Sequence, residues 1–566
     1  MNLTPSTRIE RYRREGWWRG DTIHGLFDRL VARGPEATAV VDAPNREEFC
    51  VGAPVRWTYA NLADVADRLA SALLAGGVRR DDVVMVQLPN VAELVAVYLA
   101  CSRIGAIVSP LPVQFRAHEL RQTTVLTEPA AFVTTTSVAG FDHCALVDEV
   151  APRSVRLRLA VTGGATAPDG WRAFAGAVDE TPDRRAVAEA AAATRAEDVL
   201  TVCWTSGTEA DPKGVPRSHD LWTAIASATV DGAELRDGDV LLTPFPVVNM
   251  SGIGGMLVPW LLTGGSLVLH QPMSLPVFLR QVVTERVNYT VAPPVLLQLL
   301  LAKPEMLAEV DLSSFRTIGS GSAPLPPAMV KGWKDRHGIE IVNFFGSNEG
   351  IALVGGPADI PDPEERARVF PRFGGDGLSW SNRVSQGLET KLVDPQTGAA
   401  VTAPGEVGEL LIAGPTVFDG YWRRDDLTEK AFDGEGFFRT GDLFQLEDDR
   451  HYRFVGRARD LIIRGGMKIA PEELEALLSQ HPKVADVAVV GLADPKVQGE
   501  QIVTAVVVPK DGEDVELPEI REYLRGLGVA GYKEPRRLVV VEALPRNPLG
   551  KVLKRDLRVG DPASNA

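Results

Sequence analysis

The sequence predicts an α/β protein, with a large N-terminal domain of mostly parallel sheets and helices plus a β-barrel-like part, followed by a small α+β domain. Short apolar runs alternate with helix-like spacing over much of residues 57–345, which is typical of parallel sheets covered by helices. After Asp460 the pattern changes to single helices between short strands. The chain has 566 residues, 45% of them hydrophobic, which is enough to bury a sizeable core.

The alternating elements follow one another from residue 57. Apolar residues at helical spacing run from Leu62 to Leu73, and the apolar run 83–88 then predicts a buried strand. A second helix-like run leads to a short strand at 106–108. The Ala-rich segment 184–196 predicts a surface helix or connector before a strand at 199–204. Further alternation runs through 240–242, 266–270, 289–301 and 340–345.

Residues 389–446 are expected to form the turn-rich β part of the large domain. We expect that domain to span residues 1–457, with an N-terminal extension at 1–25. The small domain is expected at 458–566, with the helix PEELEALLSQH from Pro471 and strands around 484–490 and 502–508.

Composition excludes several classes of protein. The chain carries 60 Lys and Arg against 75 Asp and Glu, a formal charge of −15, which argues against binding nucleic acid or an anionic membrane. Its four cysteines have no metal or redox spacing and fit a reducing, cytoplasmic location. The first 20 residues lack the apolar core of a signal peptide. The longest apolar stretch, 94–113, is interrupted by Arg103 and two prolines, so no membrane span is predicted.

The segment WTSGTEADPKG, residues 204–214, has the composition of a phosphate-binding loop. Glycine lets backbone N–H groups converge on phosphate oxygens, hydroxyls add donors, and a lysine adds positive charge. The residues concerned are Thr205, Ser206, Gly207, Thr208 and Lys213. A Walker loop is disfavoured because Lys213 lies between Pro212 and Gly214. The Gly-rich strings at Gly319 and Ser251 both lack the third glycine of a dinucleotide fingerprint.

This loop resembles the phosphate-binding loop of the adenylate-forming enzymes, which include acyl-CoA synthetases, aryl-acid and amino-acid adenylation domains, and luciferases. Further motifs of that family follow in the same order and cover nearly the whole chain. They are GSGSAPLP at Gly319, FFGSNEG at Phe344, GELLIAGPTVFDGYW at Gly408, FFRTGDL at Phe437, GRARDLIIRGGMKIAPEELE at Gly456 and PRNPLGKVLKRDL at Pro545.

The resemblance implies a reaction in two halves and a role for each matching residue. A carboxylate attacks the α-phosphate of ATP and expels pyrophosphate, and a thiol then displaces AMP. Lys551 is expected to be the catalytic cation, and Glu349 the acidic residue near Mg²⁺. Asp442 matches the ribose-binding carboxylate and Arg457 an arginine near ribose and phosphate. The other expected contacts to the nucleotide are Ser322, Ala323, Pro324, Phe345, Gly346 and Asn348.

Two positions depart from the family pattern in FFGSNEG. Phe345 replaces the usual tyrosine and can still stack on adenine, and Asn348 replaces a threonine and can still donate to phosphate. The resemblance also implies that the small domain is mobile. Arg459 falls at the hinge between the domains, where Asp or Lys is common, and Gly466 would leave room for a pantetheine arm.

The acyl pocket is expected along residues 243–255 and the strand end at Gly319, with Val248, Asn249, Ser251 and Gly321 in its wall. This wall is small and apolar and offers no aspartate for a substrate ammonium, so an α-amino acid is disfavoured. Asn249 matches an asparagine of dihydroxybenzoate and salicylate enzymes, but their adjacent histidine is missing. We expect a medium-chain, alicyclic or aromatic acid.

The leading hypothesis is a carboxylic acid:CoA ligase that uses ATP, Mg²⁺ and CoA. The first alternative is an acyl- or aryl-acid adenylating enzyme that loads an amine or the phosphopantetheine of a carrier protein. The opening ERYRREGWW resembles the start of such enzymes, although an amphipathic helix that covers the large domain explains it as well. A non-catalytic acyl or nucleotide binder is a remote alternative. Phosphotransfer is disfavoured because the sequence has no Walker loop and no kinase H-R-D signature.

Overall fold

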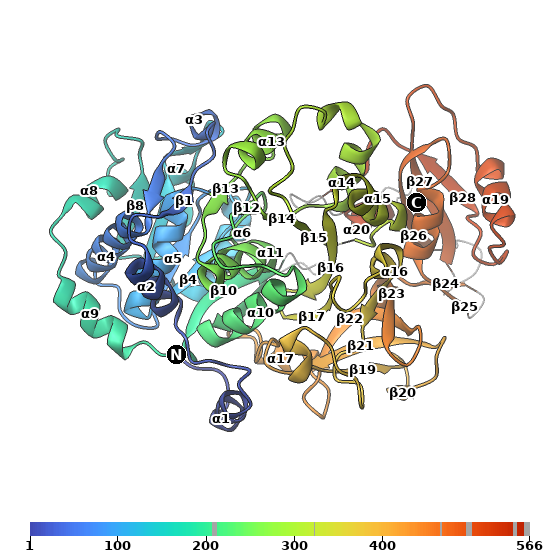
Figure 1. The fold of residues 1–566 in the computed structure, drawn as a ribbon, viewed down its shortest axis with the longest axis horizontal. Coiled ribbons are helices and arrows are strands. Elements are labelled where there is room, and N and C mark those ends of the chain that lie inside the picture. The colour runs from blue at the N-terminus through green and yellow to red at the C-terminus, as the bar shows by residue number, and fades with distance from the viewer. Residues whose placement is uncertain (206–211, 322, 465–466, 494–500, 547–551, 560–566) are drawn as a thin grey trace. The chain divides into compact units, whose positions relative to one another are not determined.

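The computed structural model describes residues 1–205, 212–321, 323–464, 467–493, 501–546 and 552–559 (Figure 1). By its internal contacts the chain forms two compact units: Met1–Glu389 with Ile412–Phe438, and Thr390–Leu411 with Arg439–Ala566. The predicted α/β class is confirmed. Residues 390–411 and 439–457, expected in the large domain, group by contacts with the second unit, and the domain boundary at 457 stays a prediction.

The first unit contains a seven-stranded sheet built from the early alternating elements. Its strand order is β11-β10-β4-β3-β5-β8-β9, and its strands are parallel except for the antiparallel edge pair β10 and β11. The strands are β3 (Val83–Val86), β4 (Ile107–Pro110), β5 (Ala131–Thr135), β8 (Leu157–Val161), β9 (Arg172–Ala173), β10 (Val199–Thr205) and β11 (Lys213–Ser218).

The helices of this region match the predicted spacing. The helix α4 (Tyr59–Ala75) starts at a Thr58 capping box and buries Leu62, Leu69 and Leu73. Every residue of α5 (Ala92–Ile104) is buried, which explains the apolar stretch there. The Ala-rich α9 (Arg184–Ala193) buries only Val187, as a surface helix should. Within the described residues, no helix is both long and apolar enough to cross a membrane.

An eight-stranded sheet forms the rest of the first unit's framework, in the order β17-β16-β15-β14-β12-β13-β1-β2. The interior pairs are parallel, and both edges end in an antiparallel pair. The strands are β1 (Thr38–Val41), β2 (Arg56–Thr58), β12 (Leu241–Thr243), β13 (Leu267–Leu269), β14 (Tyr289–Val291), β15 (Thr317–Gly321), β16 (Glu340–Ser347) and β17 (Gly350–Gly355). Its core includes apolar side chains of α13 (Leu275–Thr284), α14 (Pro294–Ala302) and α15 (Pro327–His337).

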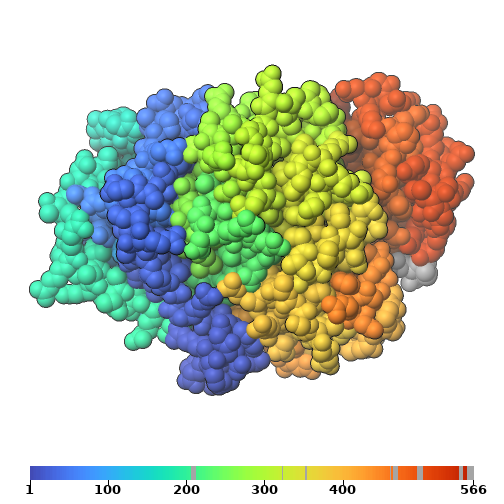
Figure 2. All heavy atoms as spheres, in the orientation of Figure 1, coloured from blue at the N-terminus to red at the C-terminus, as the bar shows by residue number. Residues whose placement is uncertain are grey.

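The N-terminal helix α1 (Ser6–Arg14) packs on the first unit, which agrees with the amphipathic interpretation of ERYRREGWW. Tyr12 and Trp18 are buried against Leu221 and Ala224 of α10 (His219–Gly232). The indole of Trp18 donates to the carbonyl of Pro415, 3.0 Å away. In Figure 2 this segment is the group of dark blue atoms at the lower edge of the view, in contact with green and orange atoms of the chain.

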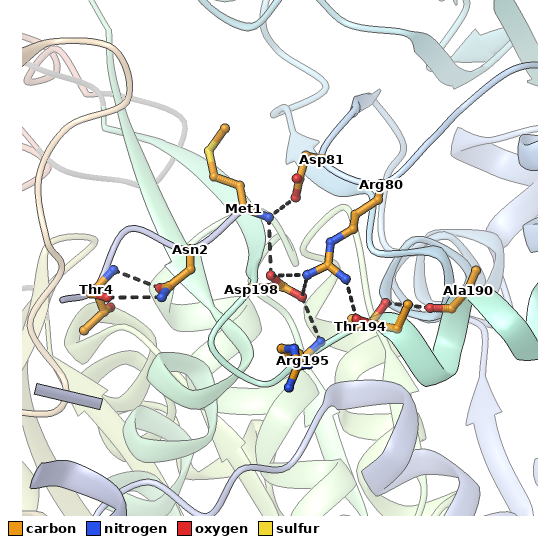
Figure 3. A network of polar contacts seen from close by, with 10 residues as sticks. Met1, Asn2, Thr4, Arg80, Asp81, Ala190, Thr194, Arg195 and Asp198 are labelled. Atoms are coloured by element: carbon orange, nitrogen blue, oxygen red, sulfur yellow. Dashed lines mark hydrogen bonds and ion pairs between the residues drawn. The ribbon is translucent and has the colours of Figure 1, made fainter. Parts of the chain in front are cut away.

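A polar network fixes the start of strand β10, which leads into the predicted phosphate loop (Figure 3). The guanidinium of Arg80 donates to both carboxylate oxygens of Asp198, at 2.7 and 2.5 Å. The same carboxylate accepts from the backbone N–H of Arg195 and contacts the ammonium group of Met1. Because Asp198 immediately precedes β10, these contacts anchor that strand at the end opposite Thr205.

The second unit contains antiparallel hairpins and the predicted α+β region. Strands β22 (Phe438–Leu446) and β23 (His451–Arg457) pair antiparallel, as do β19 (Glu389–Val393) and β20 (Ala400–Val401), and β21 (Val407–Ala413) lies between β22 and β19 in the same sheet. The C-terminal region has a sheet of β26 (Val484–Ala493), β27 (Gln501–Pro509) and β28 (Arg537–Val540), a hairpin of β24 (Ile462–Arg464) and β25 (Met467–Ile469), and helices α18 (Pro471–Leu478) and α19 (Leu517–Gly526).

Lys554 ties the last described helix, α20 (Lys554–Val559), to α18. Its ammonium lies 2.8 Å from the carboxylate of Glu475 and 3.1 Å from that of Glu472, and the three side chains are at most 20% exposed. Burial alone would lower the pKa of Lys554, but the two carboxylates outweigh it and the net shift is upward. Lys554 therefore holds the part of this motif that follows the predicted catalytic lysine, Lys551, in the sequence.

We expect Lys554→Met to lower the free energy of unfolding of the second unit by roughly 3 kcal/mol, because it leaves two largely buried carboxylates without their cation. Hydrogen–deuterium exchange of peptides from α18 and α20 at rising urea concentration measures the loss, because all ten tryptophans lie in the first unit and their fluorescence reports only its unfolding. Adding Glu475→Gln to the same variant should restore part of it. Equal stability of Lys554→Met and the parent protein would contradict this assignment.

Candidate active site

A pocket opens in the first unit at the carboxyl ends of β14, β15 and β16, where parallel α/β sheets usually bind ligands. It encloses about 630 Å³ of atom-free space, including its open mouth. The facing wall comes from α10 and from the helix that starts at Met250. The lining residues are Ile225, Thr229, Phe245, Met250, Ser251, Gly254, Gly255, Tyr289, Val291, Ala292, Ser320, Gly321, Phe344, Phe345 and Gly346.

Glycines allow the walls of this pocket to approach closely. A Cβ on Gly321 would lie 2.3 Å from the carbonyl oxygen of Phe344, and one on Gly254 would lie 2.7 Å from Ile225. Gly254 and Gly255 belong to η1 (Ile253–Leu257), one turn of π-helix inside an otherwise α-helical segment. Such turns occur often at functional sites. A Cβ on Gly255 would have its nearest neighbour 3.7 Å away, in Val291, so this glycine borders open space.

Two of the four residues expected in the acyl pocket, Ser251 and Gly321, line it. Val248 is buried, and the side chain of Asn249 accepts the N–H groups of Ser251 and Gly252 as the N-cap of α11 (Met250–Gly252). Neither is among the lining residues, and their proposed contact with an acid stays a prediction.

The wall formed by Ile225, Thr229 and Tyr289 was not predicted from the sequence. Thr229 donates to the carbonyl of Gly254 at 3.1 Å, and Ser320 to that of Ala292 at 2.8 Å. These hydroxyls are thus already used within the protein. The remaining side chains of the wall are mainly aliphatic or aromatic, which agrees with the predicted apolar pocket.

Asn348 joins three segments beside the pocket. Its side-chain amide donates to the carbonyl of Trp204 at 3.1 Å and accepts the N–H of Met250 at 3.0 Å. Its own carbonyl accepts from the guanidinium of Arg217 at 2.8 Å. Asn348 therefore ties the end of β10 to the start of the pocket helix. The predicted donation to phosphate would use the second amide hydrogen.

Arg217 is a buried residue that holds the backbone at Asn348, and no sequence motif predicted this role. It lies on β11, is 1% exposed, and also donates to the carbonyl of Thr416 at 3.1 Å. Burial lowers the pKa of its guanidinium to about 10, so it stays charged at neutral pH. A buried arginine that holds the backbone at Asn348 fixes the strand end that carries the predicted Mg²⁺ ligand.

Glu349, Tyr421 and Lys213 come together in the first unit. The hydroxyl of Tyr421 donates to the carboxylate of Glu349 at 3.0 Å, and the ammonium of Lys213 lies 5.4 Å from the centre of the Tyr421 ring. Tyr421 belongs to the GYW string, to which the sequence alone assigned no role. Tyr421 thus contacts both Glu349, the predicted acid, and Lys213, the predicted lysine of the phosphate loop.

We expect Tyr421→Phe to raise the KM for MgATP about tenfold, because a hydrogen bond to a charged group is lost while the ring beside Lys213 is kept. Steady-state pyrophosphate release measures this. Tyr452→Phe, which removes a buried hydroxyl of the second unit bonded to Thr390, serves as the matched control. An unchanged KM for MgATP in Tyr421→Phe would refute the role given to this contact.

The donor set around Glu349 suits magnesium bound together with phosphates. Mg²⁺ is usually held by one or two carboxylates plus phosphate oxygens and waters, and the half-buried carboxylate of Glu349 can supply one such ligand. Among the described residues, no group of three His, Cys, Asp or Glu forms a complete metal cage. A Mg²⁺ ion at Glu349 would neutralise part of the negative charge of the ATP phosphates.

In the second unit, Asp442 and Arg457 lie opposite each other on β22 and β23. The guanidinium Nε of Arg457 is 3.1 Å from the carboxylate of Asp442, whose side chain is 8% exposed. The structure thus brings together the two residues predicted to bind ribose and phosphate. Their contact with a nucleotide stays a prediction.

The remaining predicted residues divide into two groups. Thr205 ends β10, Ala323 and Pro324 are exposed after β15, and Phe345 and Gly346 line the pocket. Arg459 lies in the short helix Ala458–Asp460. The residues outside the described ranges are Ser206, Gly207, Thr208, Ser322, Gly466 and Lys551.

Comparison with known proteins identifies the class. The AMP-binding enzyme family matches residues 27–422, and the AMP-binding enzyme C-terminal domain matches residues 473–551. The chain therefore belongs to the AMP-binding, adenylate-forming enzymes, which confirms the resemblance. It is an enzyme of the AMP-forming acid–thiol ligase family, and it activates a carboxylic acid with ATP through an adenylate.

Individual relatives cover almost the whole chain. An indoleacetate–CoA ligase of Aromatoleum aromaticum is 32% identical over 88% of this chain and 92% of its own length. A salicylyl-CoA synthase / salicylate adenylyltransferase of a Streptomyces species is 32% identical over 98% of this chain and 96% of its own. ATP-bound MatB of Rhodopseudomonas palustris superposes with a TM-score of 0.77 at 26% identity, over 95% of this chain and 99% of that one.

Proposed function

We propose that this protein is an ATP-dependent aromatic-acid:CoA ligase. The observation that supports this most is the apolar pocket of the first unit, whose wall at Phe345 and Gly346 belongs to the same strand end as Asn348 and Glu349. An aromatic body would occupy the pocket while its carboxylate faces the phosphate-binding segment. The Aromatoleum and Streptomyces relatives described above are both named for aromatic acids, one of them for CoA ligation and the other for both CoA ligation and adenylate transfer.

The first half-reaction joins the acid to AMP. A carboxylate oxygen attacks the α-phosphorus of ATP, the bond from that phosphorus to the bridging oxygen breaks, and pyrophosphate leaves with the electron pair. Two anions must approach each other in this step, so cations lower its barrier most. Lys213 and Lys551 are the proposed cations, and Glu349 would hold the magnesium that accompanies ATP.

The second half-reaction transfers the acyl group. The thiol sulfur of CoA attacks the acyl carbonyl, the bond to the phosphate oxygen breaks, AMP leaves, and the thiol proton passes to solvent. Arg459 is the proposed hinge about which the small domain turns between the two half-reactions. Gly466 is proposed to leave room for the pantetheine arm of CoA. A cytoplasmic location is part of this proposal.

Pyrophosphate release measured over a panel of aromatic, alicyclic and medium-chain acids, with and without CoA, tests the proposal. We expect aromatic acids to give the highest kcat/KM, and an acyl-CoA of matching mass to form only with CoA. Adenylate formation without any thioester would favour the second candidate, an adenylating enzyme that loads a carrier protein or an amine. The adenylyltransferase name of the Streptomyces relative supports that candidate. Binding without turnover would indicate a non-catalytic binder, and ADP as product would indicate phosphotransfer.

A further inference from the structure

Tyr289 is an unusual residue in the wall of the pocket. It lies on β14, is 0% exposed, and is among the residues that line the pocket. Its hydroxyl oxygen has no hydrogen-bond partner within the part of the chain that the structure describes. Buried tyrosine hydroxyls are almost always paired, because an unpaired one has lost its water without compensation.

Other buried tyrosines of the first unit follow that rule. The hydroxyl of Tyr59 donates to the carbonyl of Gly265 at 2.7 Å, and that of Tyr98 to the carbonyl of Val247 at 2.8 Å. The hydroxyls of Thr229 and Ser320 in the pocket wall are also paired with backbone carbonyls. Tyr289 thus differs from comparable side chains around it, and burial raises the pKa of its phenol, which stays neutral and able both to donate and to accept.

The position of the hydroxyl depends on Gly319 of the neighbouring strand. A Cβ on Gly319 would lie 2.7 Å from this oxygen and 2.8 Å from the ring of Phe344, so a side chain there would displace the phenol. The absence of a side chain at residue 319 therefore keeps the hydroxyl at this place in the wall.

Strand register places this hydroxyl far from the phosphate-binding end of the pocket. Gly319 pairs with Val342 on β16, and Gly346 lies four residues further along that strand. At about 3.3 Å per residue the separation along the strands is roughly 13 Å. The carboxylate of a bound acid would lie toward Gly346, so only the opposite end of an elongated acid can approach Tyr289.

We propose that Tyr289 is a specificity-determining residue that hydrogen-bonds a polar group, such as a hydroxyl, at the end of the aromatic acid remote from its carboxylate. This inference rests on the proposed function and narrows its substrate class. A site that buries an unpaired hydroxyl discriminates against an acid that lacks the partner group, because the pocket then keeps its unpaired donor. An ortho-hydroxyl, which lies beside the carboxylate, would not reach Tyr289.

The test compares Tyr289→Phe with the parent protein on three pairs of acids, by pyrophosphate release. Phenylacetate is compared with 4-hydroxyphenylacetate, 3-phenylpropanoate with 3-(4-hydroxyphenyl)propanoate, and benzoate with 2-hydroxybenzoate. We expect the variant to lose about tenfold in kcat/KM on the remote-hydroxyl acids. The unsubstituted acids and 2-hydroxybenzoate should change by less than about twofold, since they have no group at Tyr289.

Stability of the ligand-free protein gives a readout independent of activity. Tyr289→Phe should leave Tm unchanged or raise it, because no partner is lost, whereas the matched control Tyr59→Phe should lower Tm by breaking a buried hydrogen bond. Tyr59 lies outside the pocket, so its variant should keep the parent's ratio between remote-hydroxyl and unsubstituted acids.

Equal loss on all acids in Tyr289→Phe, or a loss confined to 2-hydroxybenzoate, would overturn the role of Tyr289 while leaving the ligase proposal intact. A fall in Tm as large as that of Tyr59→Phe would also overturn it, because it would reveal a structural partner. If the parent protein releases no pyrophosphate with any carboxylic acid, the proposed function itself fails.

Discussion

Lys551→Ala is expected to lower adenylate formation by more than about 100-fold, because a positive charge aimed at the α-phosphate stabilises the transition state more than the ground state. The second half-reaction should survive, since thioester formation from supplied acyl-adenylate does not need that charge. ATP–pyrophosphate exchange measures the first half and acyl-CoA formation from the acyl-adenylate measures the second. The separation of the two effects is what a two-step mechanism predicts.

Lys510→Ala is the matched control, because Lys510 is an exposed lysine of the same unit whose ammonium donates to the backbone carbonyl of Pro482 at 2.6 Å. It should keep both half-reactions near the parent rates. Unchanged ATP–pyrophosphate exchange in Lys551→Ala would contradict the role given to Lys551. Equal loss in both half-reactions would instead indicate a structural defect.

Gly255→Leu is expected to have the second largest effect, a rise of at least about tenfold in the KM for aromatic acids with little change in the KM for MgATP. Gly255 lines the pocket, and the nearest atom to an added Cβ is 3.7 Å away in Val291, so the backbone accepts a side chain that then fills the space. The lost volume excludes the acid but leaves Glu349 and Tyr421 in place. Steady-state kinetics with acid and nucleotide varied in turn measure both constants.

Gly176→Leu provides the same substitution at a helical glycine that has no atom within 4 Å of an added Cβ and lies outside the pocket. This control should leave the KM for the acid and the KM for MgATP unchanged. The comparison distinguishes the effect of filling the pocket from the general effect of placing a leucine in a helix. Acid kinetics in Gly255→Leu that match the parent would show that the acid binds elsewhere.

The strand and helix alternation of the first unit was predictable because its apolar periodicity is strong. The run 83–88 became β3, the run 199–204 became β10, and the segment 289–301 became β14 followed by α14. The strands of the segment 390–411 were predicted, but the sequence does not show which unit they contact most. They group with the second unit, and this grouping depends on packing between residues that are distant in the sequence.

The site was predictable where chemistry leaves a motif and not where packing forms the wall. Asp442 and Arg457 were predicted as nucleotide ligands from separate motifs, and strand pairing brings them together, while their contact with a nucleotide stays a prediction. Ile225 and Thr229 lie on α10, which is buried along most of its length, so nothing in the sequence distinguishes the pocket-facing residues from the others. Tyr289 likewise resembles any aromatic residue of a buried strand until its unpaired hydroxyl is seen.

Attack of a carboxylate on the α-phosphate of ATP is tested most directly by an acid labelled with oxygen-18 in its carboxylate. After turnover with ATP and CoA, mass spectrometry of the products should find one labelled oxygen in AMP, none in pyrophosphate, and the other in the acyl-CoA carbonyl. Label in inorganic phosphate, or AMP that carries no label, would contradict an acyl-adenylate intermediate.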